Sequence, residues 1–282
     1  MSNYQNILAV IDNNNNSHSL VQKALALSKR SNAELTFLNL SNQDNSIPAI
    51  SPANLSTPFI EQNKVNVVKA KTTKAYPAIS EELSNNSYDL IIKNKITKHH
   101  NYMGISPCDD WKLLRNSSAP LMLVTKTQWQ SHGHLLTAIE TEEKTSLHNA
   151  LNRDILEHSY RLSEQLASKV HLINCYLGED PSISLTSSSL GMNFISQKDL
   201  HWQHLKMLSG NNLEIDQELH LQQGIPETEI SLMAIKYDVN MVIIGTAEHN
   251  SLVGTIFGHT SEYIIDELQC DVLAVKNSVT HH

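Results

Sequence analysis

The feature that most constrains the fold of this chain is an internal repeat with an offset of about 150 residues. Val239–Asn277 contains, in order, a buried apolar strand, a glycine-marked loop, a helix and a short strand, and Tyr88–Lys126 has the same order. DLIIK corresponds to NMVIIG, and LLRNSSAPLMLVTK corresponds to IIDELQCDVLAVKN. The halves also begin alike, because YQNILAVID (Tyr4–Asp12) and HLLTAIE (His134–Glu140) are apolar strands that end in a carboxylate. A repeat of this size predicts two homologous domains and not a solenoid.

Strand and helix signals alternate along both halves, which indicates parallel sheets with helices on both faces. Asn6–Ile11 is almost entirely apolar, as expected for a strand that is buried on both faces. The predicted fold class is therefore α/β, with two tandem flavodoxin-like (Rossmann-like) domains, each a five-stranded parallel sheet. We expect the domains to span residues 1–127 and 133–282, with TQWQSHG (Thr127–Gly133) as the linker, and a strand of the second domain at Leu213–His220.

The first half departs from the repeat at Asn42–Asn63. This segment contains Pro48, Pro52 and Pro58 and has no helical period, whereas the second half has a helix signal at Gln197–Leu208. We expect an extended loop in place of that helix, and such a loop can open an apolar cavity beneath it at the top of the sheet.

Composition excludes several classes of protein. The chain has 29 acidic and 21 basic residues, a formal charge of −8 and no basic block, so we expect no nucleic-acid partner. The N-terminus has no signal-peptide pattern, and no apolar run approaches the length of a membrane span. Three widely spaced cysteines form no CxxC pair, which fits a reducing cytoplasm. We therefore expect a cytoplasmic protein without a membrane partner.

Four segments carry a family resemblance: YQNILAVID, DWKLLRNSSAPLMLV, LHNALNRDILEHSYRLSEQL and GTAEHNSLVGTIFGHTSEYIIDELQCDVLAVK. With these segments the chain resembles the tandem universal stress proteins, most closely the two-domain E type of proteobacteria. The resemblance implies adenine nucleotide alpha hydrolase-like domains and a bacterial, non-enzymatic stress-response function. It also implies that the first domain is structural and the second senses a ligand.

Nucleotide-binding members of that family carry a glycine, two residues, a second glycine, nine residues, and then glycine followed by serine or threonine. Glycines let the backbone approach phosphates, and the last pair lies at a helix N-terminus. The second half matches this pattern in part, because Glu248 stands at the second glycine and adds negative charge where phosphate would lie. The candidate nucleotide-binding residues are Glu140, Gly245, Thr246, Gly258, His259 and Thr260.

This partial match leaves alternatives open. The two glycines can serve only the turn and the helix start, and Glu140 can simply cap its loop. Alternatively, the second domain binds ATP, with slow ATPase activity at most, or the chain carries or senses an apolar metabolite. In the first half Lys93 replaces the first glycine and Ile96 the second, and Asp109 and Asp110 would repel a phosphate, so we expect no ATP there.

Neither catalysis nor metal binding has support from motifs. There is no G-x-S-x-G elbow, HExxH helix or Walker loop, so we name no catalytic residue. Histidines 99, 100, 132 and 134 and Cys108 lack metal-ligand spacing, so we name no metal ligand either.

The fifth strands, PLMLV (Pro120–Val124) and DVLAV (Asp271–Val275), are expected at sheet edges if the family's strand order holds. Exposed apolar edges invite pairing. We therefore expect the two strands to pair with each other within one chain, so that the two domains form an intramolecular pseudo-dimer. The chain itself is then expected to be a monomer or a homodimer, and its protein partners are unidentified.

Overall fold

The computed structural model describes residues 3–12, 17–40, 64–95, 109–117, 119–141, 145–178, 195–210, 215–246 and 259–276. The elements of the first half follow the order β1 (Asn6–Ile11), α1 (Ser17–Ser31), β2 (Glu34–Asn39), β3 (Val65–Lys69), α3 (Ala75–Asn85), β4 (Leu90–Asn94), α4 (Asp109–Asn116) and β5 (Leu121–Val124). The second half follows with β6 (His134–Ala138), α5 (Ser146–Leu166), β7 (Lys169–Tyr176), α7 (Gln197–Ser209), β8 (Gln217–Gln223), α8 (Pro226–Lys236), β9 (Met241–Gly245), α9 (His259–Glu267) and β10 (Asp271–Val275). The extended segment predicted at Asn42–Asn63 lies outside the described residues.

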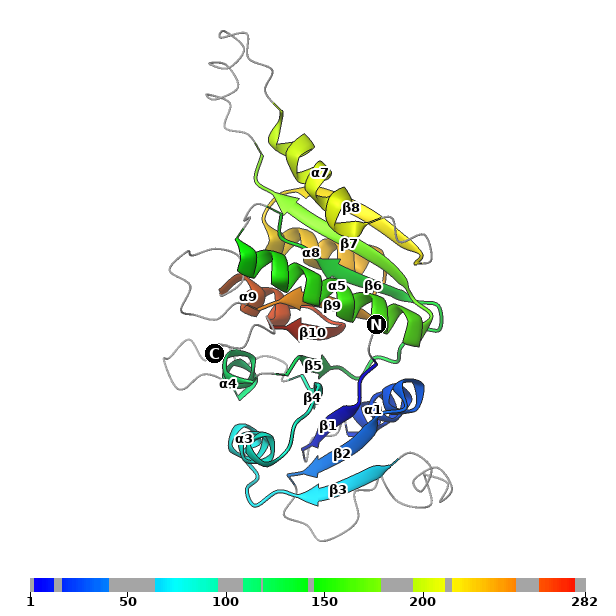
Figure 1. Ribbon diagram of the computed structural model, residues 1–282, viewed down its shortest axis with the longest axis vertical. Coiled ribbons are helices and arrows are strands. Elements are labelled where there is room, and N and C mark those ends of the chain that lie inside the picture. Colours follow the sequence, from blue (N-terminus) through cyan, green and yellow to red (C-terminus); the bar gives the residue numbers. More distant parts are fainter. Residues whose placement is uncertain are drawn as a thin grey trace.

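All ten described strands form one sheet, in the order β3-β2-β1-β4-β5-β10-β9-β6-β7-β8 (Figure 1). Neighbouring strands within each half are parallel, which confirms the predicted pair of five-stranded parallel sheets. The halves meet where β5 pairs antiparallel with β10, with Met122 opposite Leu273. The two fifth strands therefore satisfy each other's edges, and β3 and β8 end the described sheet.

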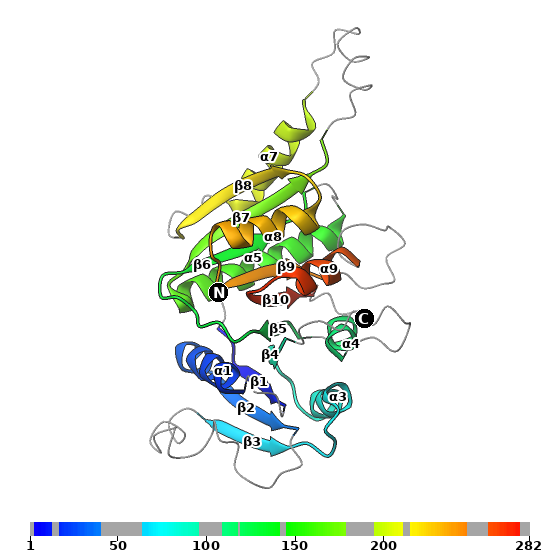
Figure 2. The ribbon, with the colours of Figure 1, turned by 180° about the vertical axis from the view of Figure 1, so that it is seen from behind.

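Helices cover both faces of the sheet (Figure 1, Figure 2). Helices α1, α5 and α7 contribute Leu20, Ile155 and Leu205 to the buried core on one face. Helices α3, α4, α8 and α9 form the core on the other face, where Ile79 and Ile230 are buried. Because strand residues point alternately to the two faces, continuous apolar strands supply both cores at once.

One strand differs from its predicted position. The strand expected at Leu213–His220 lies instead at Gln217–Gln223, where it pairs with β7 from Val170 to Tyr176. The polar residues of QELHLQQ conceal the strand from a search for apolar runs. Polar residues are common on a strand that ends a sheet, because one of its edges has no partner strand.

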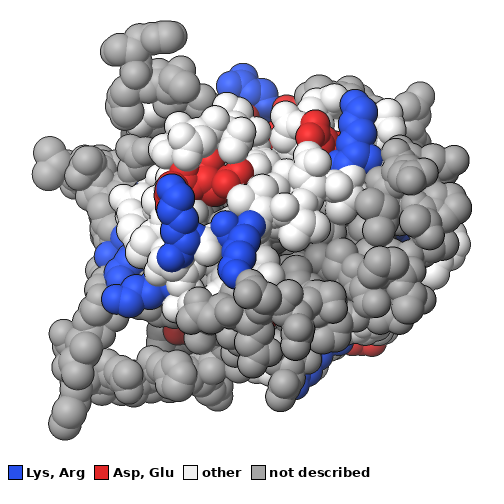
Figure 3. All heavy atoms as spheres, turned by 90° about the horizontal axis from the view of Figure 1, so that it is seen from below, with Lys and Arg blue, Asp and Glu red and all other residues white. Residues whose placement is uncertain are grey.

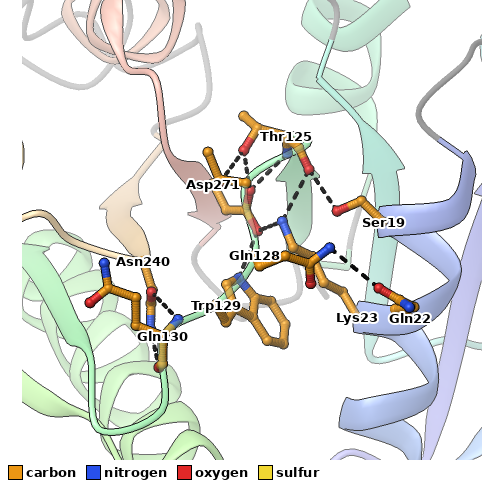
Figure 4. Close-up of polar contacts among 10 residues, drawn as sticks. Ser19, Gln22, Lys23, Thr125, Gln128, Trp129, Gln130, Asn240 and Asp271 are labelled. Atoms are coloured by element: carbon orange, nitrogen blue, oxygen red, sulfur yellow. Dashed lines mark hydrogen bonds and ion pairs between the residues drawn. The ribbon is translucent and has the colours of Figure 1, made fainter.

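A buried carboxylate holds the two halves together (Figure 4). Asp271, the first residue of β10, accepts hydrogen bonds from Thr125 N at 2.7 Å, Thr125 Oγ1 at 2.8 Å and Trp129 Nε1 at 2.8 Å. Lys23 of α1 lies with its Nζ 2.6 Å from Asp271 Oδ2, and it also donates to the Thr125 carbonyl at 3.1 Å. Both side chains of this ion pair are buried. Three segments that are distant in the sequence thus converge on one carboxylate.

The linker is fastened to the second half beside this carboxylate (Figure 4). Gln130 N donates to Asn240 Oδ1 at 2.8 Å, and Asn240 Nδ2 donates back to the Gln130 carbonyl at 3.0 Å. A Cβ atom at Gly133 would lie 2.3 Å from Asn240 Nδ2, so this close approach requires glycine. The linker is therefore held in a defined conformation against the second half.

Acidic and basic side chains are intermixed on the face at the β3 end of the sheet (Figure 3). Lys71 and Glu81, both exposed, pair with each other on the surface of the first half. Within the described residues, the structure has no helix long and apolar enough to cross a membrane.

Candidate functional site

The candidate site of the second half lies at the carboxyl ends of its parallel strands. This is where ligands bind in open α/β sheets. Strands β6, β7 and β9 bring Glu140, Asn174 and Gly245 to the same cavity, which has a volume of about 40 Å³. Its described lining consists of Ala138, Ile139, Glu140, Ile173, Asn174, Cys175, Pro226, Ile230, Ile244, Gly245 and Ile264.

Glu140 is held at this position through its backbone. Asn152 of α5 accepts from Glu140 N at 3.3 Å and donates to the Glu140 carbonyl at 2.6 Å. The residue is buried and lines both the first cavity and a second one of about 210 Å³ between the end of β6, α5 and α7. The structure thus places this candidate at the junction of two cavities.

A buried polar network next to Glu140 was not evident in the sequence. Thr141 Oγ1, Asn174 Oδ1 and His201 Nδ1 lie 2.7–3.0 Å from one another. Asn174 also donates to the Ile139 carbonyl at 2.7 Å. The network joins β6, β7 and α7, whose residues are too far apart in sequence for any spacing rule to group them.

The other sequence candidates fall into two groups. Gly245 ends β9 and lines the cavity, and Thr246 follows it with its N–H donating to the Val275 carbonyl at 2.8 Å. Gly258 lies outside the described residues, and His259 and Thr260 form the start of α9 without described side chains. The structure therefore brings Glu140 and Gly245 together at one cavity.

The sheet register corrects one correspondence between the halves. Ile7 of β1 pairs with Leu90, and its repeat counterpart Leu135 of β6 pairs with Met241. Counting along β4 and β9 from these pairs makes Asn94, and not Lys93, the counterpart of Gly245. The sequence comparison was wrong by one residue because the apolar run LII of β4 is one residue shorter than the run MVII of β9, so that the ends of the runs do not mark the register.

Side chains occupy the equivalent region of the first half. Asn94 is buried and donates from Nδ2 to Asp12 Oδ1 at 3.0 Å, where Asp12 is the counterpart of Glu140. Lys93 Nζ lies 2.7 Å from Asp110 Oδ1 at the start of α4, and both of these side chains are buried. The amide and this ion pair thus stand where the second half has Gly245 and a cavity.

The described part of the second-half cavity offers little catalytic chemistry. Burial raises the pKa of the Cys175 thiol to about 12, so the thiol stays protonated at neutral pH and is a poor nucleophile. None of the described lining residues is a lysine or arginine. The described walls of this cavity are therefore mostly apolar, with Glu140 and Asn174 as polar groups.

Comparisons with known proteins agree with this architecture. The model of the universal stress protein family matches residues 3–83 and 111–276. Universal stress protein E of Salmonella typhi is 25% identical over 302 residues, which cover 98% of this chain and 95% of that protein.

Two solved structures are similar over nearly the whole chain. A protein of unknown function from Pseudomonas aeruginosa PAO1 superposes with a TM-score of 0.76 at 22% identity, covering 98% of this chain and 93% of the other. A universal stress protein from Archaeoglobus fulgidus DSM 4304 has a TM-score of 0.61 at 17% identity, with 96% of each chain covered. At these identities the structures establish the fold, and the family match covers both halves. The chain therefore belongs to the universal stress protein family, with two tandem domains of that family.

Proposed function

We propose that this protein is a non-enzymatic stress-response protein whose second half senses a ligand and whose first half is a structural partner. The observation that carries the proposal is the difference between the two equivalent strand ends. Gly245 borders a cavity in the second half, whereas Asn94 fills the same position in the first half and is bonded to Asp12. This difference supports a ligand site in the second half and a structural role for the first half.

The buried ion pair of the first half supports its structural role. Lys93 and Asp110 are withdrawn from water and bonded to each other, so separating them to admit a ligand would expose both charges to a low-dielectric interior. Breaking such a pair costs about 3–5 kcal/mol. Few small ligands could offset that cost in addition to their own loss of freedom.

The chemistry of the second-half cavity supports a ligand with an apolar part. Five isoleucines line it, one directly after β6 and the others from β7, α8, β9 and α9. Glu140 and Asn174 supply a carboxylate and an amide beside them. A few polar groups in an apolar pocket are the usual composition of small-molecule sites.

ATP is the second candidate ligand, and the position of Gly245 favours it. This residue ends β9 one loop before α9, whose N-terminus can receive a phosphate. Glu248 in the connecting loop opposes it, because its carboxylate would repel a phosphate group. We therefore rank ATP behind an uncharged or partly apolar ligand.

The test is native mass spectrometry of freshly purified protein, with a denatured control. Gly245→Asn gives the second half the residue of the first, and Glu140→Gln removes one charge without changing shape. We expect a small-molecule adduct on the wild-type chain that both variants lose, and that exposed Glu267→Gln keeps. A nucleotide mass would establish the ATP alternative, and an adduct unaffected by both variants would refute the assignment to this cavity.

A further inference from the structure

We propose that His171, His220 and Glu218 form a binding site for a divalent transition-metal ion such as Zn²⁺. The three residues lie on adjacent strands β7 and β8, at the far end of the sheet from the seam between the halves. Their potential ligand atoms lie within 4.8 Å of one another. Nothing in the candidate ligand site described above uses them.

The strand register explains why these residues meet. His171 lies directly opposite Glu218 in the pairing of β7 with β8, and His220 follows Glu218 by two residues. Residues two apart on a strand point to the same face. That face also carries Ile173 and is covered by α8, with Tyr237 at the C-terminal end of the helix packed against both imidazoles (Figure 2).

The distances match the size of a coordination sphere. His171 Nδ1 is 2.8 Å from His220 Nε2, and each nitrogen is 3.9 Å from a Glu218 carboxylate oxygen. Zinc binds nitrogen and oxygen at about 2.0–2.2 Å, so two ligands of a tetrahedral ion lie about 3.4 Å apart. The observed separations fall on both sides of that value, and small side-chain rotations would equalise them. Two imidazoles and one carboxylate leave a fourth position for water.

A third histidine orients the first. His134 Nδ1 lies 2.8 Å from the other ring nitrogen of His171, Nε2. When Nε2–H of His171 donates to His134, the lone pair of His171 Nδ1 is directed toward His220 and Glu218. Ligating histidines characteristically donate their second N–H to such a partner, which fixes the tautomer. His134 is thus a positioning residue.

The surroundings allow the ion to enter and the imidazoles to bind it. His171 is 1% and His220 8% exposed, whereas the Glu218 side chain is 43% exposed at the edge of the sheet. His171 Nδ1 and His220 Nε2, 2.8 Å apart, share a hydrogen bond, so a bound ion takes the place of the proton between them and His220 keeps its own proton on Nδ1. The buried histidine pair and the accessible carboxylate thus offer three ligand atoms to a metal ion.

One cation competes for the carboxylate. Lys169 Nζ lies 3.1 Å from Glu218 Oε2, and its side chain is about one-third exposed. Lys236 stands farther away, with its Nζ over the Tyr237 ring. Because Glu218 has two oxygens, it can keep Lys169 on one and offer the other to the ion. Removing Lys169 should therefore strengthen metal binding, which a purely structural histidine cluster would not do.

The test is equilibrium dialysis of the full-length protein against Zn²⁺ at pH 7.5, with metal analysis of the retained protein. Glu218→Gln is the primary variant because this half-exposed side chain can change without disturbing the core. We expect it to weaken the tightest zinc site by at least about 10–100-fold, the loss typical when only an outer-shell partner of a metal ligand is changed. We expect His220→Gln to do the same, Lys169→Met to tighten binding severalfold, and exposed His18→Gln to change nothing.

Zinc held by other histidines, including His281 and His282, contributes equally to all variants and cancels in the comparison. Visible absorption of bound Co²⁺ provides a second readout, because tetrahedral and octahedral sites differ in intensity. Equal zinc binding by wild type, Glu218→Gln and His220→Gln would overturn the proposal. Weaker or unchanged binding by Lys169→Met would exclude the Glu218 carboxylate as a ligand.

Discussion

The buried carboxylate at the seam makes a strong prediction about stability. Asp271→Asn keeps the size and shape of the side chain but removes its charge and turns one oxygen into an NH₂ group. Four donor contacts converge on the two oxygens: two from Thr125, one from Trp129 and one from Lys23. The amide of asparagine has only one acceptor oxygen, and its NH₂ group accepts no hydrogen bond. The donors that face the NH₂ group therefore lose their acceptor.

The magnitude follows from the donors that lose their partner. Oδ2 receives Lys23 Nζ at 2.6 Å and Trp129 Nε1 at 2.8 Å, in a site where Lys23 and Asp271 are 3% and 0% exposed. A hydrogen bond to a charged group contributes about 1.5–3 kcal/mol, and breaking a buried ion pair costs about 3–5 kcal/mol. We therefore expect Asp271→Asn to lower the free energy of unfolding by about 3–5 kcal/mol.

Urea unfolding followed by far-UV circular dichroism measures this change, with the slope of the transition checked against wild type. Asp238→Asn is the matched control. Asp238 is exposed and bonded to Gln130 of the linker, and its backbone has a φ of 46°, which asparagine adopts readily. We expect the control to stay within about 0.5 kcal/mol of wild type. A loss of less than about 1 kcal/mol in Asp271→Asn would refute the role assigned to the seam carboxylate.

Three further predictions concern individual side chains. Burial and nearby Arg161 lower the pKa of His158 to about 4, so the imidazole takes up a proton at higher pH in the unfolded chain than in the folded one. As the pH falls from 6.5 to 4, the free energy of unfolding should therefore decrease by up to about 3 kcal/mol. His158→Gln should reduce this dependence of stability on pH. Lys93→Met should destabilise the protein by about 3–5 kcal/mol in urea, while adducts in native mass spectra persist. Glu248→Gly should tighten ATP binding about fivefold or more by calorimetry, and unchanged affinity would contradict the repulsion argument.

Much of the fold was predictable because its signals are local. The apolar runs of β1, β4 and β9 and the repeated order of elements required the parallel sheets, and the apolar fifth strands predicted their own pairing. Register was not predictable at the one-residue level. Asn94 was recognised as the counterpart of Gly245 only from the pairing with Ile7 and Leu135, because the apolar runs LII of β4 and MVII of β9 differ in length and align in either register.

The candidate site was predictable only in part. Glu140 and Gly245 follow from the position of a strand end, since parallel strands of a repeat finish at the same edge. The network around Asn174 and His201 and the group around His171 depend on which strands and helices become neighbours. One local signal did exist: Glu218 and His220 are spaced to share a face, but the strand that carries them was placed too early in the chain.

The seam between β5 and β10 has a consequence for how the halves can diverge. In a dimer of identical chains every substitution occurs twice, and the interface must remain self-complementary. Here Val124 pairs with Asn94 and Val275 pairs with Gly245, so Val124 and Val275 are repeat counterparts and Pro120 stands where the second half has Asp271. One half can therefore contribute an acceptor while the other contributes Lys23 and Thr125 as donors. Covalent linkage thus lets each strand end differ from its repeat counterpart, and Asn94 and Gly245 differ in the same way at the carboxyl ends of β4 and β9.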